Sequence, residues 1–164
     1  MSEVNAPGDA GNNADESGVT FEVKKVYTKD LSLETPNSPA VFTQEWDPDV
    51  NVQLHTGASQ LDEQFFEVVL TVTVTAKLGE NTAYLVEVHQ GGIFQIVGVP
   101  DEEMGPVLGS VCPGILFPYA REVVGDLVQR GGFQQMVLTP VNFDALYYQH
   151  VMENANQAEG EASA

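Results

Sequence analysis

Apolar and polar residues alternate along four stretches in the first two thirds of the chain, at the spacing of β-strands. The clearest stretch is 65–76, where apolar side chains from Phe66 to Ala76 fill the even positions and mostly threonines fill the odd ones. The same alternation predicts further strands over 19–34, 49–56 and 82–99.

Glycine and proline punctuate this pattern. Turns over 57–63 and 78–81 join the last three strands, which predicts an antiparallel sheet. We expect Gly91–Gly92 to interrupt the fourth strand as a bulge or sharp bend, and the first strand to bend near Lys24–Lys25. A loop over 35–48, which contains three prolines, separates the first strand from the second.

The last third of the chain changes to helical spacing. Three acids at 101–103 open a short helix that Pro113 ends. A helix over 115–130 stops at Gly131–Gly132, and the N-cap candidate Asn142 opens a last helix. Strands followed by helices predict an α+β fold, with a four-stranded antiparallel sheet and helices packed on one face.

Composition sets the ends of the expected domain. Residues 1–18 are rich in acids, Gly and Asn, with Val4 as the only large apolar side chain between Met1 and Val19. Such a segment cannot bury enough surface to offset its ordering entropy, so we expect a disordered acidic tail. Residues 155–164 are predicted to be disordered as well, which leaves one ordered domain over 19–154.

Two loops carry more large apolar side chains than a solvated connection needs. The 35–48 loop holds Phe42 and Trp46, the only tryptophan, and the segment 133–138 holds Phe133 and Met136. Since loops run over the surface, these side chains either plug the ends of the core or line a groove. Two such loops together favour a deformable groove for extended apolar segments.

The chain is strongly acidic, with a net charge of -18 from 24 acids and six bases. Nucleic acids require clustered Lys and Arg, so they are excluded as partners, and an anionic membrane surface is disfavoured. The acidity serves either solubility or an electronegative face for a basic partner.

Apolar residues also remain outside the predicted core. Val69 and Leu85 lie on the sheet face that the helices leave open, and Val86 and Val88 sit on a strand that we place at a sheet edge. Exposed apolar strand surface invites association, so we expect an oligomer.

No catalytic or cofactor motif accompanies these features. Cys112 is the single cysteine and reads as a buried, inert thiol. The three histidines are far apart in sequence and form no metal-binding pair, and neither a serine nucleophile motif nor a phosphate loop is present. We therefore expect no enzyme and no cofactor. Without a membrane span or a signal peptide, we expect a cytoplasmic protein.

Several segments in one order resemble the SecB family, the protein-export chaperones of proteobacteria. They are Val-Tyr-Thr-Lys-Asp at 26–30, the strand 65–78, Glu-Val-His-Gln-Gly-Gly-Ile-Phe at 87–94, the segment 112–122 and Pro-Val-Asn-Phe-Asp-Ala-Leu at 140–146. The resemblance covers about residues 19–150. It implies an ATP-independent cytosolic holdase, a homotetramer built as a dimer of dimers, that binds unfolded precursor proteins and delivers them to the motor ATPase SecA.

The resemblance also implies roles for individual residues. The family's SecA-binding positions match Asp30, Glu34, Leu85 and Glu87, and the SecA segment that binds there is basic and carries its own zinc. The positions between dimers match Val86, Val88 and Gln90; Val86 stands where relatives can carry cysteine. The client groove matches Phe42, Trp46, Val50, Val52, Leu54, Phe133, Met136, Phe143 and Tyr147.

Two alternatives stay open at this point. A SecB-like chaperone devoted to an antitoxin would share the fold but hold another client. A small-ligand-binding or hydrolytic α+β domain would instead show a closed pocket around Trp46 with converging polar groups.

Overall fold

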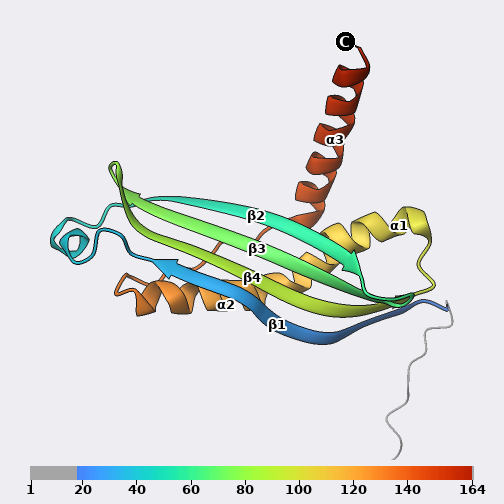
Figure 1. Ribbon diagram of the computed structural model, residues 1–164, viewed down its shortest axis with the longest axis horizontal. Helices are drawn as coiled ribbons and strands as arrows, with labels where there is room; N and C mark the ends of the chain where they lie inside the picture. The colour runs from blue at the N-terminus through green and yellow to red at the C-terminus, as the bar shows by residue number, and fades with distance from the viewer. Residues whose placement is uncertain (1–17, 164) are drawn as a thin grey trace, which may run out of the picture.

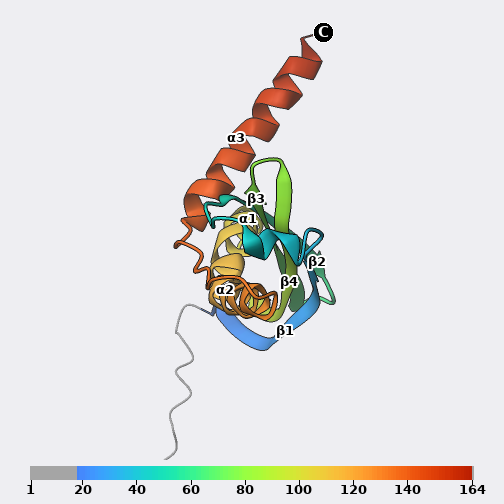
Figure 2. The same cartoon turned by 90° about the vertical axis from the view of Figure 1, so that its left-hand side faces the viewer.

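Four long antiparallel strands form one curved sheet, and the helices lie on one face of it (Figures 1 and 2). The computed structural model describes residues 18–163. The strands are β1 (Thr20–Glu34), β2 (Asp49–Gln60), β3 (Phe65–Leu78) and β4 (Asn81–Val97), in the order β1-β4-β3-β2. The predicted α+β architecture is confirmed. The predicted N-terminal tail lies outside the described residues, apart from Gly18.

The position of β4 corrects one expectation. This strand lies between β1 and β3, so Val86 and Val88 are not on a sheet edge but fully buried in the core. The edges are β1 and β2, which the 35–48 loop joins around the end of the sheet (Figure 1). This crossover loop contains one short 3-10 helix, η1 (Ala40–Thr43). Sequence alternation shows which residues share a face, but it does not show the order of the strands.

The predicted interruption at Gly91–Gly92 is wrong, because β4 pairs through both glycines with β1 and β3 without a register shift. The glycines are needed for space. A Cβ on Gly91 would lie 2.7 Å from Cζ of Tyr27, and one on Gly92 would lie 2.9 Å from Cδ2 of Leu116. Side chains on both sides of the sheet therefore pack directly onto this backbone.

Besides a shift between Ala76 and Lys77 of β3, the irregularities lie in β1, where the pairing with β4 shifts between Val23 and Lys25 and again between Thr28 and Asp30. The first shift agrees with the predicted bend. Each shift exchanges the two faces of the strand. As a result Val26 and Leu31 are opposite the buried side of β4, while Lys25 remains on the helix-free face. A strand without these shifts would have directed a lysine toward the core.

The turn predicted over 57–63 is shorter than expected. Gly57, Ala58 and Ser59 continue the pairing of β2 with β3, and the chain reverses only at 61–64. There the Asp62 carboxylate accepts hydrogen bonds from the backbone N–H groups of Gln64 and Phe65, at 2.8 and 3.0 Å. The second hairpin turns at 78–81 as predicted, with Gly79 at φ 61°.

Pro113 does not end a helix, contrary to the prediction. The chain is helical from α1 (Asp101–Pro106) through the π-turn η2 (Val107–Val111) to α2 (Cys112–Arg130). A π-turn widens the helix by one residue, and the Cys112 N–H donates to the Val107 carbonyl. The wider turn accommodates a proline that has no N–H to donate. The helix ends at Gly131–Gly132 as predicted, with Gly132 at φ 88°.

The helix spanning 101–130 is long and apolar enough to cross a membrane by length and composition alone. In this structure, however, the apolar side of the helix packs on the sheet. Buried residues of α2 face the sheet and pack on the even-numbered side chains of β3 and β4. Five α2 residues at four-residue spacing are fully buried: Cys112, Leu116, Ala120, Val124 and Val128. This is the arrangement of a core helix.

The last helix, α3 (Phe143–Ala162), is longer than expected. It begins as predicted at Asn142, whose side chain accepts a hydrogen bond from the Ala145 N–H at 3.0 Å. The sequence predicted disorder from residue 155, whereas the structure continues the helix to Ala162. Alanine, glutamine and glutamate favour the helix there without packing. The second half projects away from the sheet (Figures 1 and 2).

Candidate binding surfaces

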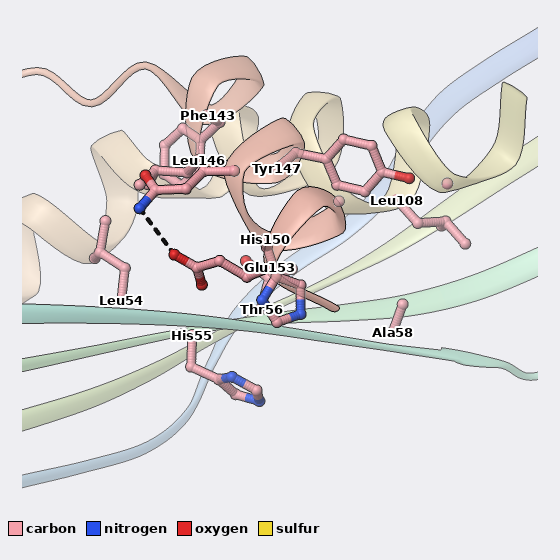
Figure 3. Close-up of a pocket in the computed structure, with 13 residues that line it drawn as sticks. Leu54, His55, Thr56, Ala58, Leu108, Phe143, Leu146, Tyr147, His150 and Glu153 are labelled. Carbon is pink, nitrogen blue, oxygen red and sulfur yellow. Dashed lines mark hydrogen bonds between the residues drawn. The ribbon is translucent and has the colours of Figure 1, made fainter. Parts of the chain in front are cut away.

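A trough runs between β2 and α3 on the helix side of the sheet. One hollow of about 470 Å³ lies between Leu54, on β2, and Tyr147, on α3 (Figure 3). A second, of about 620 Å³, is bounded by Val52 and by the segment 136–142. Leu54 and Leu146 line both hollows, which makes them one continuous apolar surface.

Aromatic rings close the loop end of the trough. The Trp46 ring lies 5.3 Å from Phe133 and 6.3 Å from Tyr84, and Phe42 lies 5.1 Å from Phe133 (centroid distances). The Tyr84 hydroxyl donates to the Met136 sulfur at 3.5 Å. Two loops far apart in sequence therefore meet here, and Phe133 is the buried centre of what we call the aromatic cluster (Phe42, Trp46, Tyr84 and Phe133).

The first turns of α3 hold the other wall in place. The Phe143 ring meets Phe117 edge-on at 5.7 Å, and the Ser110 hydroxyl donates to Asp144. Tyr147 lies over Gly109, where an added Cβ would come within 2.7 Å of its ring. Beyond this point α3 has few attachments, so the wall is anchored at one end only.

The groove residues expected from the resemblance divide into two groups. Val52, Leu54, Met136, Phe143 and Tyr147 line the hollows of the trough. Phe42, Trp46 and Phe133 form the aromatic cluster, and Val50 is exposed on β2 but lines neither hollow. Trp46 packs on rings and not around a polar-lined pocket, so the small-ligand alternative gains no support.

Sequence reasoning missed Leu108, Val141 and Leu146 as lining residues. Leu146 lies on the apolar stripe of the last helix, and that stripe could have indicated it. Leu108 carried no signal, because the continuous helix through the π-turn was not expected.

The opposite, helix-free face of the sheet holds the four residues matched to the SecA-binding positions. Glu34 pairs with Leu85, and Asp30 and Ser32 pair with His89 and Glu87, their neighbours along the same face of β4. The β1–β4 register thus gathers Asp30, Glu34, Leu85 and Glu87 on one surface, which we call the acidic face. Alternation had placed each pair on one side of its own strand, and the pairing brings the two pairs together.

Hydrogen bonds fix several side chains on this face. His89 Nε2 lies 2.6 Å from Glu87 Oε1, and its Nδ1 lies 3.2 Å from the Thr71 hydroxyl. The Tyr27 hydroxyl donates to Glu67, which also binds the Lys29 ammonium at 2.8 Å. The hydrogen bonds from Lys29 and Tyr27 lower the pKa of Glu67, while burial and the Glu67 contact raise the pKa of Tyr27 to about 12.

The three residues matched to the interface between dimers, Val86, Val88 and Gln90, point to the helix side and are buried under α2 within one chain. Gln90 is satisfied there by the Thr28 hydroxyl, which donates to it at 3.1 Å. These three residues therefore belong to the core of a single chain. The surface of α2 carries exposed Tyr119, and Val111 is exposed just before it.

Cys112 lies fully buried between the helix and the sheet, and burial raises the pKa of its thiol to about 12. A thiol with this pKa remains protonated at neutral pH and is a poor nucleophile, as the sequence predicted. Among residues 18–163, no three His, Cys, Asp or Glu side chains come together as metal ligands would.

Comparisons with known proteins agree with this architecture. The family model described as preprotein translocase subunit SecB matches residues 14–154. A protein-export protein SecB of Methylococcus capsulatus is 60% identical over 139 residues, which cover 85% of this chain and 90% of the relative. One of Nitrosospira multiformis is 54% identical over 138 residues, covering 84% of this chain and 87% of the relative.

A solved structure shares the fold at low sequence identity. It is a Mycobacterium tuberculosis SecB-like chaperone in complex with a peptide from the HigA1 antitoxin, and it matches with a TM-score of 0.62 at 14% identity. The match covers 74% of this chain and 90% of that chain. Since the family model spans most of the sequence and both relatives exceed half identity, the chain belongs to the SecB family.

Proposed function

We propose that this chain is an ATP-independent, non-enzymatic holdase of the cytoplasm that keeps unfolded precursors in the trough and passes them to SecA. Membership of the SecB family gives the chain a chaperone role in protein export. The observation that supports the proposal best is the trough itself. It is open, apolar and bounded by two loops and a helix anchored at one end, which suits unfolded segments of varied sequence.

The acidic face supports the step that involves SecA. Glu34 pairs with Leu85, and Glu87 and Asp30 lie further along the same side of the sheet, which no helix of residues 18–163 covers. A basic segment with an apolar residue at its centre would complement this surface in charge and shape. Trough and acidic face lie on opposite sides of the sheet, so a client and SecA could be held at the same time.

A homotetramer would cover the apolar surface that one chain leaves exposed on its long helix. Val111 is 46% exposed and Tyr119 is 50% exposed. The chain has a mass of 17.7 kDa, and we expect a native mass about four times larger. In that arrangement, Val86, Val88 and Gln90 would support α2 from below.

The decisive experiment measures holding and assembly in one preparation. A chemically unfolded precursor is diluted into buffer with and without the protein, without ATP, and its aggregation is followed by light scattering. We expect suppression at about one tetramer per precursor, with the native mass measured by light scattering after gel filtration. Undiminished aggregation at that ratio would refute the holdase.

A second candidate is a chaperone devoted to an antitoxin. The solved SecB-like chaperone was captured with an antitoxin peptide, and the same trough would accept such a segment here. At 14% identity, that structure supports the fold alone. The relatives above 50% identity are called protein-export proteins. Deleting the gene and measuring the export of envelope proteins separates the two, because only the export chaperone would leave unprocessed precursors behind.

A further inference from the structure

His89 lies on the helix-free face of the sheet, next to residues of the acidic face. Its cross-strand neighbours form one row over all four strands, which runs Asp30, His89, Thr71 and His55. Glu87 precedes His89 by two residues on β4, so both side chains leave the same side of the strand. His89 is therefore adjacent to two of the carboxylates that give the acidic face its charge.

Two hydrogen bonds hold the His89 ring in one orientation. Its Nε2 lies 2.6 Å from Oε1 of Glu87, and its Nδ1 lies 3.2 Å from the Thr71 hydroxyl. A hydroxyl can donate to a ring nitrogen without a proton or accept from one that carries a proton. Both the neutral ring, with its proton on Nε2, and the imidazolium can therefore keep these two contacts. The site allows the ring to change its charge without changing its place.

The contact with His89 also determines where the Glu87 carboxylate points. The Glu87 side chain is 43% exposed, and a long exposed side chain otherwise samples several rotamers. The bond to the ring uses Oε1, so Oε2 can still accept a hydrogen bond from a partner. The His89 side chain is itself 31% exposed, which leaves the pair within reach of a docking segment.

The charged groups closest to His89 are acids. The titratable side chains nearest to it on each strand of this face are Asp30 on β1, Glu87 on β4, Glu67 on β3 and His55 on β2. Glu67 is already paired with the Lys29 ammonium, and His55 lies at the far end of the row. Directly opposed residues on neighbouring strands have Cβ atoms about 5 Å apart. A proton on His89 would therefore act mainly on Asp30 and Glu87.

We propose that His89 is a positioning residue of the acidic face, which orients Glu87 for a basic partner when neutral and offsets its charge when protonated. This inference rests on the proposed delivery to SecA and specifies what sets the strength of that contact. Histidine is the side chain whose charge ordinarily changes between about pH 5 and pH 8. A positive charge beside two carboxylates weakens their attraction for a basic segment, and it holds Glu87 in a charge-assisted hydrogen bond. The acidic face should therefore bind SecA less tightly as the pH falls.

Two substitutions separate orientation from charge. His89→Gln keeps an N–H donor for Glu87 but cannot gain a proton, whereas His89→Ala removes the donor as well. Affinity of the full-length proteins for SecA is measured by titration calorimetry at low salt, near pH 7.5 and near pH 6. Dividing the affinity of each variant by that of the parent at the same pH removes the titration of SecA itself.

The two substitutions should give different pH profiles. We expect His89→Gln to bind within about twofold of the parent near pH 7.5, and about fivefold more tightly than the parent near pH 6. His89→Ala should bind about threefold or more below the parent near pH 7.5, because Glu87 loses its fixed orientation. Rescue by Gln but not by Ala near pH 7.5 identifies the orienting role, and the divergence near pH 6 identifies the charge.

Proton release provides a second measurement. If SecA prefers the neutral ring, binding expels a proton from His89. Calorimetry near pH 6.5 in two buffers of different ionisation enthalpy should show that the parent releases up to about half a proton more per bound chain than His89→Gln. His55→Gln makes the same change at the far end of the row. It is the matched control and should follow the parent in both measurements.

The outcomes separate this inference from the proposed function. Equal pH profiles and equal proton release for the parent and His89→Gln would overturn it. So would an equal change in His55→Gln, or equal losses for the Gln and Ala variants near pH 7.5. Suppression of precursor aggregation at the parent level shows that each variant is folded. If the parent holds precursors but does not bind SecA at either pH, the proposed delivery fails and this inference fails with it.

Discussion

At the scale of single residues, the helix-free face is organised around the Glu67 carboxylate. This carboxylate accepts hydrogen bonds from the Tyr27 hydroxyl and the Lys29 ammonium, and it joins β1 to β3 across β4. Gly91 makes this possible, because the Tyr27 ring lies directly against its backbone. The Glu67 carboxylate thus connects the edge strand β1 to β3, which is two positions away in the sheet.

Replacing Tyr27 with Phe tests this contact. We expect the free energy of unfolding to fall by about 1 kcal/mol at neutral pH, because the hydrogen bond to Glu67 is lost. The folded chain raises the pKa of Tyr27 to about 12, so the group binds its proton more tightly when folded. Its contribution is present below the ordinary pKa of about 10 and is lost as pH rises toward 12.

The Tyr27→Phe variant should therefore lose part of the alkaline decline in stability. Urea unfolding near pH 8 and near pH 11, at one protein concentration, measures this difference. Tyr148→Phe, a change at an exposed ring on α3, is the matched control and should unfold like the parent. An unchanged alkaline decline in Tyr27→Phe would show that the phenol does not couple to folding.

At the scale of elements, aromatic side chains join the crossover loop to the segment after α2. Phe42 and Trp46 come from the first, Phe133 from the second, and Tyr84 of β4 supports them from the sheet. Phe133 is 8% exposed and Phe42 is 49% exposed, although their rings are neighbours. Burial therefore separates the residue that holds the loops from the residue that is free to meet a client.

This difference in burial predicts that one alanine variant mainly loses stability and the other mainly loses client binding. Phe133→Ala should lower the free energy of unfolding by about 3 kcal/mol, since it empties the centre of the cluster. Phe42→Ala should cost less than about 1 kcal/mol and instead weaken binding of an unfolded precursor several-fold. Chemical unfolding measures the loss of stability in Phe133→Ala.

The fluorescence of Trp46 measures the loss of binding in Phe42→Ala. Trp46 is the only tryptophan and lies in the aromatic cluster, so its fluorescence should change during titration with precursor. Equal stability losses in the two variants would contradict the division of roles.

At the scale of the whole molecule, the sheet separates two surfaces of different chemistry. The trough is apolar and bounded by two loops and a helix, whereas the acidic face carries carboxylates and is built on the paired strands β1 and β4. A change on one surface should leave the other intact, provided the sheet remains folded.

Charge reversal on the acidic face tests this separation. Asp30→Lys combined with Glu87→Lys should weaken binding to SecA by about tenfold or more at low salt, because two attractive contacts become repulsive. The parent affinity should itself fall as salt is raised. Suppression of precursor aggregation should remain unchanged.

Glu102→Lys combined with Glu103→Lys changes the net charge by the same amount at two exposed acids of α1, in the helical layer, and is the control for net charge alone. Binding to SecA is measured by titration calorimetry, and holding by light scattering with the same preparations. If the double variant lost both activities to the same degree, a single shared surface would explain the data better than two.

Local features of this protein follow directly from its sequence. Alternation fixed the faces of β3 and β4, Asn142 and Gly131–Gly132 fixed helix ends, and the motifs of the family were recognisable in order. These signals are carried by residues close together in the chain, where periodicity and capping act directly.

Features that depend on contacts between distant segments could be seen only in the folded chain. The place of β4 inside the sheet, the need for Gly91 beside Tyr27 and the route of the helix past Pro113 depend on packing between separate segments. The open edge of β2 belongs with them. Its residues alternate like those of any half-buried strand, and nothing local marks which strand ends without a neighbour, because that is set by the order in which all four strands pair.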